Sequence, residues 1–176
     1  QAFPDEAAEL AEADVVTGSG TRHAILTDVQ KVLNGEEERV VDIRPHEKGE
    51  RFEELPMDKF AEHTRAFVKV EDGCNRRCAY CVIPRARGPV RSRDETSVLE
   101  ELRRLADAGY KEVVLTAISL PSYGTDSGTS LVELIEKAAE VPGIERIRLG
   151  SLAPDKLHED AIRRMAAEKQ HSPQFH

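Results

Sequence analysis

The chain has 176 residues, of which 39% are hydrophobic and 33% charged, a composition typical of a soluble globular protein. It has no apolar run long enough to cross a membrane, and its acidic N-terminus lacks the basic and apolar parts of a signal peptide. Clustered free thiols without an export signal predict a cytoplasmic location. The length allows one domain and part of another, and the missing initial methionine suggests a section of a longer protein.

The first part of the chain has the pattern of the end of an α/β domain. Apolar spacing predicts a helix over residues 3–13, a short strand at 14–16, and a second helix that ends near Leu33. Residues 1–35 are therefore assigned to this domain. The polar, acidic and proline-containing residues 36–64 are assigned to a linker.

The second part alternates strands with helices, which predicts a parallel sheet built from βαβ units. In such sheets the chemistry takes place at the carboxyl ends of the strands. The loops that follow the strands are therefore expected to surround one site at this edge of the sheet, here called the mouth. The expected elements are a strand at 66–70, irregular chain around 84–89, a helix at 94–108, a strand at 112–118, a helix opened by a capping box at Ser130, a strand at 146–149 and a helix capped by Asp155.

The only cysteines are Cys74, Cys78 and Cys81, spaced C-x3-C-x2-C on the loop after the first of these strands. Three thiolates can hold three irons of a 4Fe–4S cluster and leave the fourth iron open for a substrate, here S-adenosylmethionine (SAM). Zinc usually takes four ligands in paired motifs, and a disulfide would leave an odd thiol. The spacing favours the cluster, with zinc as the alternative.

The same loop carries a basic island. Residues 74–93 contain six arginines and no acidic residue, whereas the chain as a whole has a net charge of -8. Arginine binds phosphates and carboxylates through two parallel hydrogen bonds, so the island predicts contact with RNA phosphate or with the carboxylate of SAM. Pairing with nearby acidic side chains explains any single arginine equally well.

Three motifs, at residues 72–84, 87–93 and 115–124, resemble those of the radical-SAM methylthiotransferases. Tyr80, the aromatic residue before the last cysteine, is part of this signature. The Arg-Gly-Pro-Val-Arg-Ser-Arg run at 87–93 is most similar to the subgroup that acts on threonylcarbamoyladenosine in tRNA. Residues 1–35 also resemble the end of this family's N-terminal domain.

The resemblance implies the fold, which is a partial radical-SAM (βα) barrel in residues 65–176, preceded by the end of an α/β domain. It implies that Cys74, Cys78 and Cys81 hold a 4Fe–4S cluster, which with SAM and an electron donor yields a deoxyadenosyl radical. A methylthio group is then added to C2 of N6-threonylcarbamoyladenosine at position 37, in the anticodon loop of tRNA. A non-catalytic metal-binding module, an inactive fragment and another radical-SAM reaction are the alternatives.

The resemblance also suggests residues that contact SAM and shows where this chain departs from the family. Candidate SAM contacts are Tyr80, Thr116, Ser119 and Ser151, although turn formation explains the hydroxyl groups as well. The ligands of the family's second 4Fe–4S cluster are absent from this chain. A half barrel is expected to leave an exposed sheet edge after the third strand. Departures from the family pattern occur at Ala117, Ser119, Pro121, Ala153 and Ser172.

Overall fold

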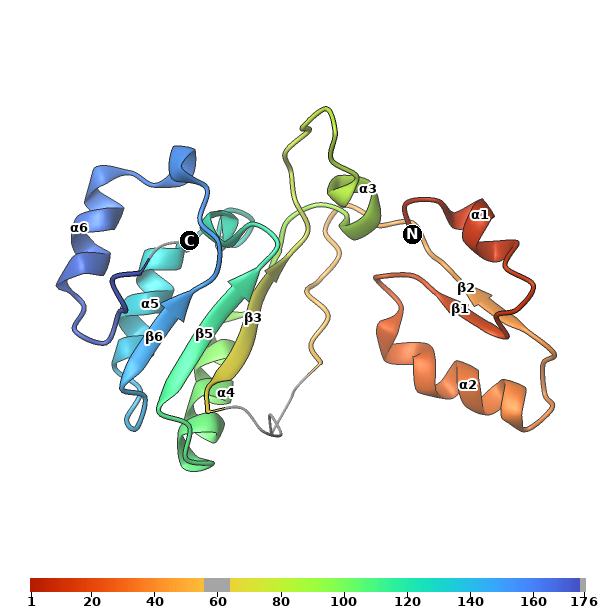
Figure 1. The fold of residues 1–176 in the computed structure, drawn as a ribbon, viewed down its shortest axis with the longest axis horizontal. Helices are drawn as coiled ribbons and strands as arrows, with labels where there is room; N and C mark the ends of the chain where they lie inside the picture. The colour runs from red at the N-terminus through yellow and green to blue at the C-terminus, as the bar shows by residue number, and fades with distance from the viewer. Residues whose placement is uncertain (56–63, 175–176) are drawn as a thin grey trace.

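The computed structural model describes residues 1–55 and 64–174, which contain two separate β-sheets (Figure 1). The first sheet has two parallel strands, in which Val15 lies opposite Val40. Helix α2 lies between these strands in the chain, and at its C-terminal end the N–H of Asn34 donates to the carbonyl of Gln30 at 2.9 Å. The elements of this part are α1 (Pro4–Ala8), β1 (Val15–Thr17), α2 (Ile25–Leu33) and β2 (Val40–Asp42).

Two expectations for this part were wrong in detail. The helix predicted over residues 3–13 ends at Ala8, because its apolar residues find little to pack against: Leu10 is 54% exposed. The guanidinium of Arg39 donates to the carbonyl oxygens of Leu10 and Ala13 at 2.8 and 2.9 Å. The predicted linker also contains strand β2, which a run of only three residues did not reveal. The domain boundaries themselves stay a prediction.

The second sheet has four strands in the order β4-β3-β5-β6, and its three longer strands are parallel, as predicted. Strand β4 runs antiparallel to the carboxyl end of β3. Helices α4 and α5 lie behind the strands in Figure 1, and α6 lies beside α5. The elements are β3 (Ala66–Asp72), α3 (Ile83–Arg87), β4 (Arg91–Ser92), α4 (Glu95–Asp107), β5 (Glu112–Ala117), α5 (Leu131–Ala139), β6 (Arg146–Leu149) and α6 (Glu159–Ala167).

The core lies between this sheet and its helices. Alternate residues of β3, Ala66, Val68 and Val70, are fully buried, as the two-residue period of a strand requires. Asp94 caps the N-terminus of helix α4, because its carboxylate accepts from the N–H of Ser97 at 3.1 Å. The predicted cap of α5 is confirmed, because the hydroxyl of Ser130 accepts from the N–H of Glu133 at 3.2 Å.

Three further expectations for the second part were wrong. Residues 83–87 form the short helix α3, which tolerates Pro84 in its first turn because the N–H that proline lacks would have no partner within the helix there. Asp155 does not cap α6, which starts at Glu159. The edge of β6 is partly covered, since the N–H of Ile147 donates to Gln170 at 2.7 Å and its carbonyl accepts from Ser172 at 2.8 Å. No helix of the described part is long and apolar enough to span a bilayer.

Candidate functional site: the cysteine loop

The three cysteines follow β3 directly and line one cavity of about 630 Å³. Cys78 is exposed, Cys74 and Cys81 are half-buried, and all three are free thiols. Two backbone hydrogen bonds shape the loop: the N–H of Cys74 donates to Gly88, and that of Cys81 to Cys78, each at 3.0 Å. The loop therefore offers three thiols to one open cavity.

Gly73 turns the chain from β3 into this loop. Its φ of +88° lies in the left-handed region that glycine adopts without strain. A Cβ atom at this position would lie 1.9 Å from the carbonyl oxygen of Pro89, a backbone atom that has no room to move. The turn before Cys74 therefore requires glycine for both its conformation and its close backbone contact.

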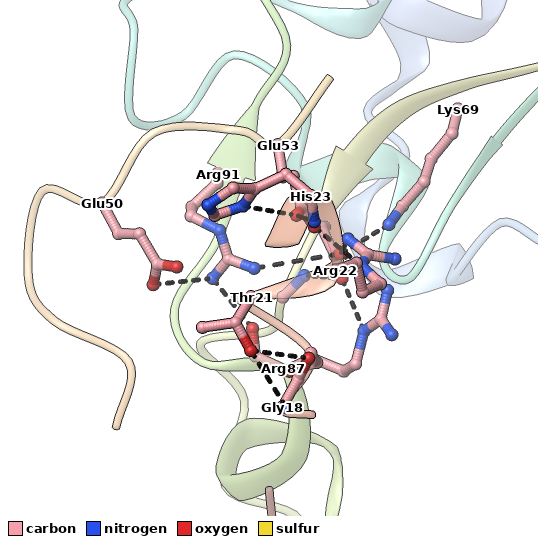
Figure 2. A network of polar contacts seen from close by, with 12 residues as sticks. Gly18, Thr21, Arg22, His23, Glu50, Glu53, Lys69, Arg87 and Arg91 are labelled. Carbon is pink, nitrogen blue, oxygen red and sulfur yellow. Dashed lines mark hydrogen bonds and ion pairs between the residues drawn. The ribbon is translucent and has the colours of Figure 1, made fainter. Parts of the chain in front are cut away.

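Asp72, which precedes this turn, is the centre of a cluster of cationic groups. Its carboxylate accepts from Arg87 Nε at 2.9 Å, from a terminal nitrogen of Arg87 at 2.6 Å and from Lys69 at 2.5 Å. It also accepts from the backbone N–H of Gly73 at 2.8 Å, and Arg22 lies 3.5 Å away. Figure 2 shows Arg22, Lys69 and Arg87 directed toward one point. The carboxylate thus joins β3, the cysteine loop and residues of the first part.

The cationic groups decide the ionisation of Asp72. Burial alone would raise the pKa of this carboxyl, but hydrogen bonds from Arg87 and Lys69 outweigh that effect and lower the pKa to about 2. Lys69 is affected in turn: burial lowers its pKa, and Asp72 opposes that change. A buried carboxylate with several charge-assisted hydrogen bonds is held firmly in place.

Most of the basic island is used internally. Arg87 and Arg91 pair with Asp72, at 2.6 and 3.8 Å, and Arg93 pairs with the buried carboxylate of Glu101. The explanation by pairing with acidic side chains is therefore the right one for these residues. Of the six arginines, Arg77 and Arg85 form no ion pair within the described residues, and both line the cysteine cavity. The guanidinium of Arg85 donates to the carbonyl oxygen of Ala2 at 3.0 Å and lies 5.2 Å from the centre of the Phe3 ring.

The loops after the three parallel strands meet at one edge of the sheet, as predicted. Arg76, on the cysteine loop, pairs with Asp155, after β6, at 2.6 Å. The backbone N–H of Ser119, after β5, donates to the carboxylate of Glu71 on β3 at 2.8 Å. Asp155 thus links two of the loops instead of capping a helix.

The cysteine donor set fits an iron–sulfur cluster better than a single ion. Within residues 1–55 and 64–174, no three His, Cys, Asp or Glu side chains are gathered closely enough to hold one metal ion. A single zinc would draw its thiolates to about 2.3 Å from one centre. Three thiols spread around a cavity suit a cluster, because its thiolate ligands bind at separate iron atoms.

The comparison with known families agrees with this donor set. Residues 68–175 match the model of the radical SAM superfamily. The chain belongs to the radical SAM superfamily. Enzymes of this superfamily use a 4Fe–4S cluster and SAM for radical chemistry.

Individual relatives are similar to this radical SAM chain over nearly its whole length. It is 36% identical to the threonylcarbamoyladenosine tRNA methylthiotransferase MtaB of Aquifex aeolicus, over 100% of this chain and 43% of that protein. It is 37% identical to the tRNA-2-methylthio-N(6)-dimethylallyladenosine synthase of Pelotomaculum thermopropionicum, over 93% of this chain and 36% of that protein. Less than half of each relative is therefore covered.

A solved structure was also similar. The radical SAM methyltransferase TsrM of Kitasatospora setae, with cobalamin and a 4Fe–4S cluster bound, matches with a TM-score of 0.47 and 22% identity. The match covers 58% of this chain and 20% of that one.

The predicted SAM contacts of this radical SAM chain lie outside the cysteine cavity. The hydroxyl of Thr116 donates to a backbone carbonyl of β3 at 3.4 Å, and that of Ser119 lies 2.8 Å from the hydroxyl of Ser122, within its own turn. Ser151 is exposed, and Tyr80 is 92% exposed. Their roles as SAM contacts stay predictions.

Glu71 is a site residue that the sequence reading missed. It is fully buried at the mouth, one carboxylate oxygen accepts from the N–H of Ser119, and the other has no hydrogen-bond partner among the described residues. Burial raises the pKa of Glu71 to about 7, although the hydrogen bond from Ser119 opposes that change. The sequence did hold a signal, because Glu71 directly follows the predicted strand at 66–70 and so continues it.

This raised pKa predicts a stability that falls with pH. Between about pH 4.5 and 7 the folded protein keeps the proton of Glu71 while the unfolded chain loses it, so the free energy of unfolding decreases by about 3 kcal/mol. Glu71→Gln should remove this decrease, because glutamine does not ionise. Urea unfolding across this pH range tests the prediction, with the exposed Glu140→Gln as control. A variant that loses stability in parallel with the wild type would contradict it.

Proposed function

We propose that this chain forms the cluster-binding part of a radical-SAM methylthiotransferase that acts on tRNA. The observation that carries the proposal is the single cavity lined by Cys74, Cys78 and Cys81 at the carboxyl edge of the parallel sheet. When bound there, a 4Fe–4S cluster with SAM would supply the one-electron chemistry that generates an organic radical. The three thiolates would hold that cluster.

Arg77 and Arg85 give the same cavity a positive wall. Neither is neutralised by an acidic side chain of the described part, so each keeps a net charge for an anionic group of a ligand, although Arg85 also donates to the carbonyl of Ala2. The carboxylate of SAM and a phosphate of RNA both suit a guanidinium. Arg76 is held by Asp155 and Arg87 by Asp72, so those arginines shape the loop instead.

A second cavity provides space for a substrate nucleoside. It has a volume of about 1120 Å³ and shares Asn75 and Pro89 with the cysteine cavity. The amide oxygen of Asn75 accepts from the N–H of Val90 at 3.1 Å, which fixes the wall between the two spaces. Lys48, Arg51 and Lys137 line this second cavity together with several acidic residues. A base flipped out of an RNA loop would reach the cluster from this side.

The substrate proposed is N6-threonylcarbamoyladenosine at position 37 of tRNA. Support comes from the MtaB relative, which is similar along 100% of this chain. The similar identity to the dimethylallyladenosine enzyme makes that nucleoside the competing substrate. Such a reaction on tRNA would take place in the cytoplasm and would need an external electron donor.

The experiment uses the whole enzyme, reconstituted with iron and sulfide and supplied with SAM and a reductant. It is given tRNA that carries either N6-threonylcarbamoyladenosine or N6-dimethylallyladenosine, and the nucleosides are analysed by mass spectrometry. We expect a methylthio group on the threonylcarbamoyl nucleoside only. A product from the dimethylallyl nucleoside alone would overturn the substrate assignment, and no product from either would overturn the proposed function.

A further inference from the structure

A chain of hydrogen bonds in the first part of the protein lies against the cysteine loop. The hydroxyl of Ser19 is 2.7 Å from Nε2 of His46, and Nδ1 of His46 is 2.6 Å from the carboxylate of Glu50. The side chain of His46 is only 5% exposed. Serine, histidine and glutamate in this order have the spacing of a hydrolytic triad.

The orientation of Ser19 argues against hydrolysis. Its hydroxyl donates to the carbonyl oxygen of Ala86 at 2.5 Å, so its single proton is directed away from His46. The oxygen of Ser19 then accepts from the histidine ring. Neither Ser19 nor His46 lines any of the five cavities described, whereas Glu50 lines two of them.

The chain of hydrogen bonds leads instead to Cys74. Ala86 belongs to α3, which follows the cysteines, and Gly88 comes directly after that helix. The ring of His46 packs against Gly88 so closely that a Cβ there would lie 2.5 Å from Cγ of the histidine. The carbonyl of Gly88 accepts from the N–H of Cys74 at 3.0 Å. His46 therefore contacts the residue that fixes the backbone of Cys74.

Glu50 connects the same histidine to the cationic cluster around Asp72. Its carboxylate lies 3.8 Å from the guanidinium of Arg91, a contact drawn in Figure 2. Arg91 in turn donates to the carbonyl oxygens of Arg87 and Pro89, at 2.8 and 3.0 Å, on either side of Gly88. Gly88 is thus held from two directions, by the ring of His46 and by the guanidinium of Arg91.

We propose that His46 is a positioning residue for the cluster: by packing on Gly88 and binding Ser19 and Glu50, it sets the place of the Cys74 ligand. The inference rests on the proposed function, because it assumes a cluster at Cys74. Groups that orient metal ligands affect both the affinity and the electronic properties of the metal site. The first part of the protein then contributes to the cluster site without supplying a ligand.

The test compares His46→Ala and His46→Gln with the control His158→Ala, an exposed histidine beside α6. Each protein is reconstituted and reduced, its EPR spectrum is recorded, and the loss of iron to a chelator is timed. We expect His46→Ala to shift the g-values and to lose iron about tenfold faster than the wild type. His46→Gln should have g-values and a rate of iron loss close to those of the wild type, because its amide can still bind Ser19.

The outcomes separate this inference from the proposed function. A wild-type protein that assembles no cluster overturns both. A wild type with a cluster, and a His46→Ala variant with unchanged g-values and iron loss, overturns the positioning role alone. If His46→Ala does not fold, Ser19→Ala replaces it, since it removes only the hydroxyl between the ring and Ala86. An unchanged spectrum in that variant would also contradict the role of this hydrogen-bond chain.

Discussion

Replacement of any one of Cys74, Cys78 and Cys81 by alanine should abolish the cluster. The cavity is lined by these three thiols and by no other cysteine, because the chain has only three. With one thiolate removed, two ligands remain for a cluster that needs three from this loop. We expect bound iron to fall from about four atoms per chain to nearly none.

Iron and sulfide analysis after anaerobic reconstitution measures this loss for each variant. Ser127→Ala, a change in an exposed loop, serves as control and should keep the wild-type iron content. A cysteine variant that retains full iron and the wild-type EPR spectrum would show that its thiol is not a ligand. A colourless wild-type protein that binds one zinc would favour the zinc alternative instead.

Replacement of Asp72 by alanine should cause the largest loss of stability. The carboxylate is 1% exposed and neutralises Arg87 and Lys69 from positions within hydrogen-bond distance. Its removal leaves these cations close together and only partly solvated. Breaking a buried ion pair by removing one partner costs about 3–5 kcal/mol, so the free energy of unfolding should decrease by about that amount.

Urea unfolding of the variant measures the decrease. Asp155→Ala is a matched control, because it also removes a carboxylate that pairs with an arginine, here Arg76 of the cysteine loop. The side chain of Asp155 is 63% exposed, whereas that of Asp72 is buried. The control should leave the free energy of unfolding nearly unchanged. Equal effects of the two substitutions would contradict the importance of burial at Asp72. Asp72→Asn, which keeps the shape of the side chain, should fall between the wild type and Asp72→Ala.

The regular elements of the second sheet could be predicted because their signals are local. Strands β3, β5 and β6 carry apolar residues at alternate or successive positions between turns, and the cap at Ser130 depends on residues three apart. The cysteine spacing predicts one shared site for the same reason. Each of these features is decided within a few positions of the sequence.

What the sequence could not predict depends on contacts between distant segments. Strand β2 exists because it pairs with β1. Asp155 does not cap the helix as predicted but pairs with Arg76, 79 positions away. The six arginines of the island look alike in the sequence, yet the buried carboxylates of Asp72 and Glu101 pair with three of them, while Arg77 and Arg85 at the cavity form no ion pair among the described residues. Charge composition gives the number of arginines but not their partners.

The EPR spectrum of the reduced, reconstituted protein, recorded with and without SAM, tests the central claim most directly. The account predicts a 4Fe–4S signal that changes when SAM is added, because the three cysteines leave one iron open. A cluster signal that SAM does not alter would contradict the proposed radical-SAM function, although the cysteine loop would still be a cluster site. The absence of any cluster would contradict the assignment of Cys74, Cys78 and Cys81 as its ligands.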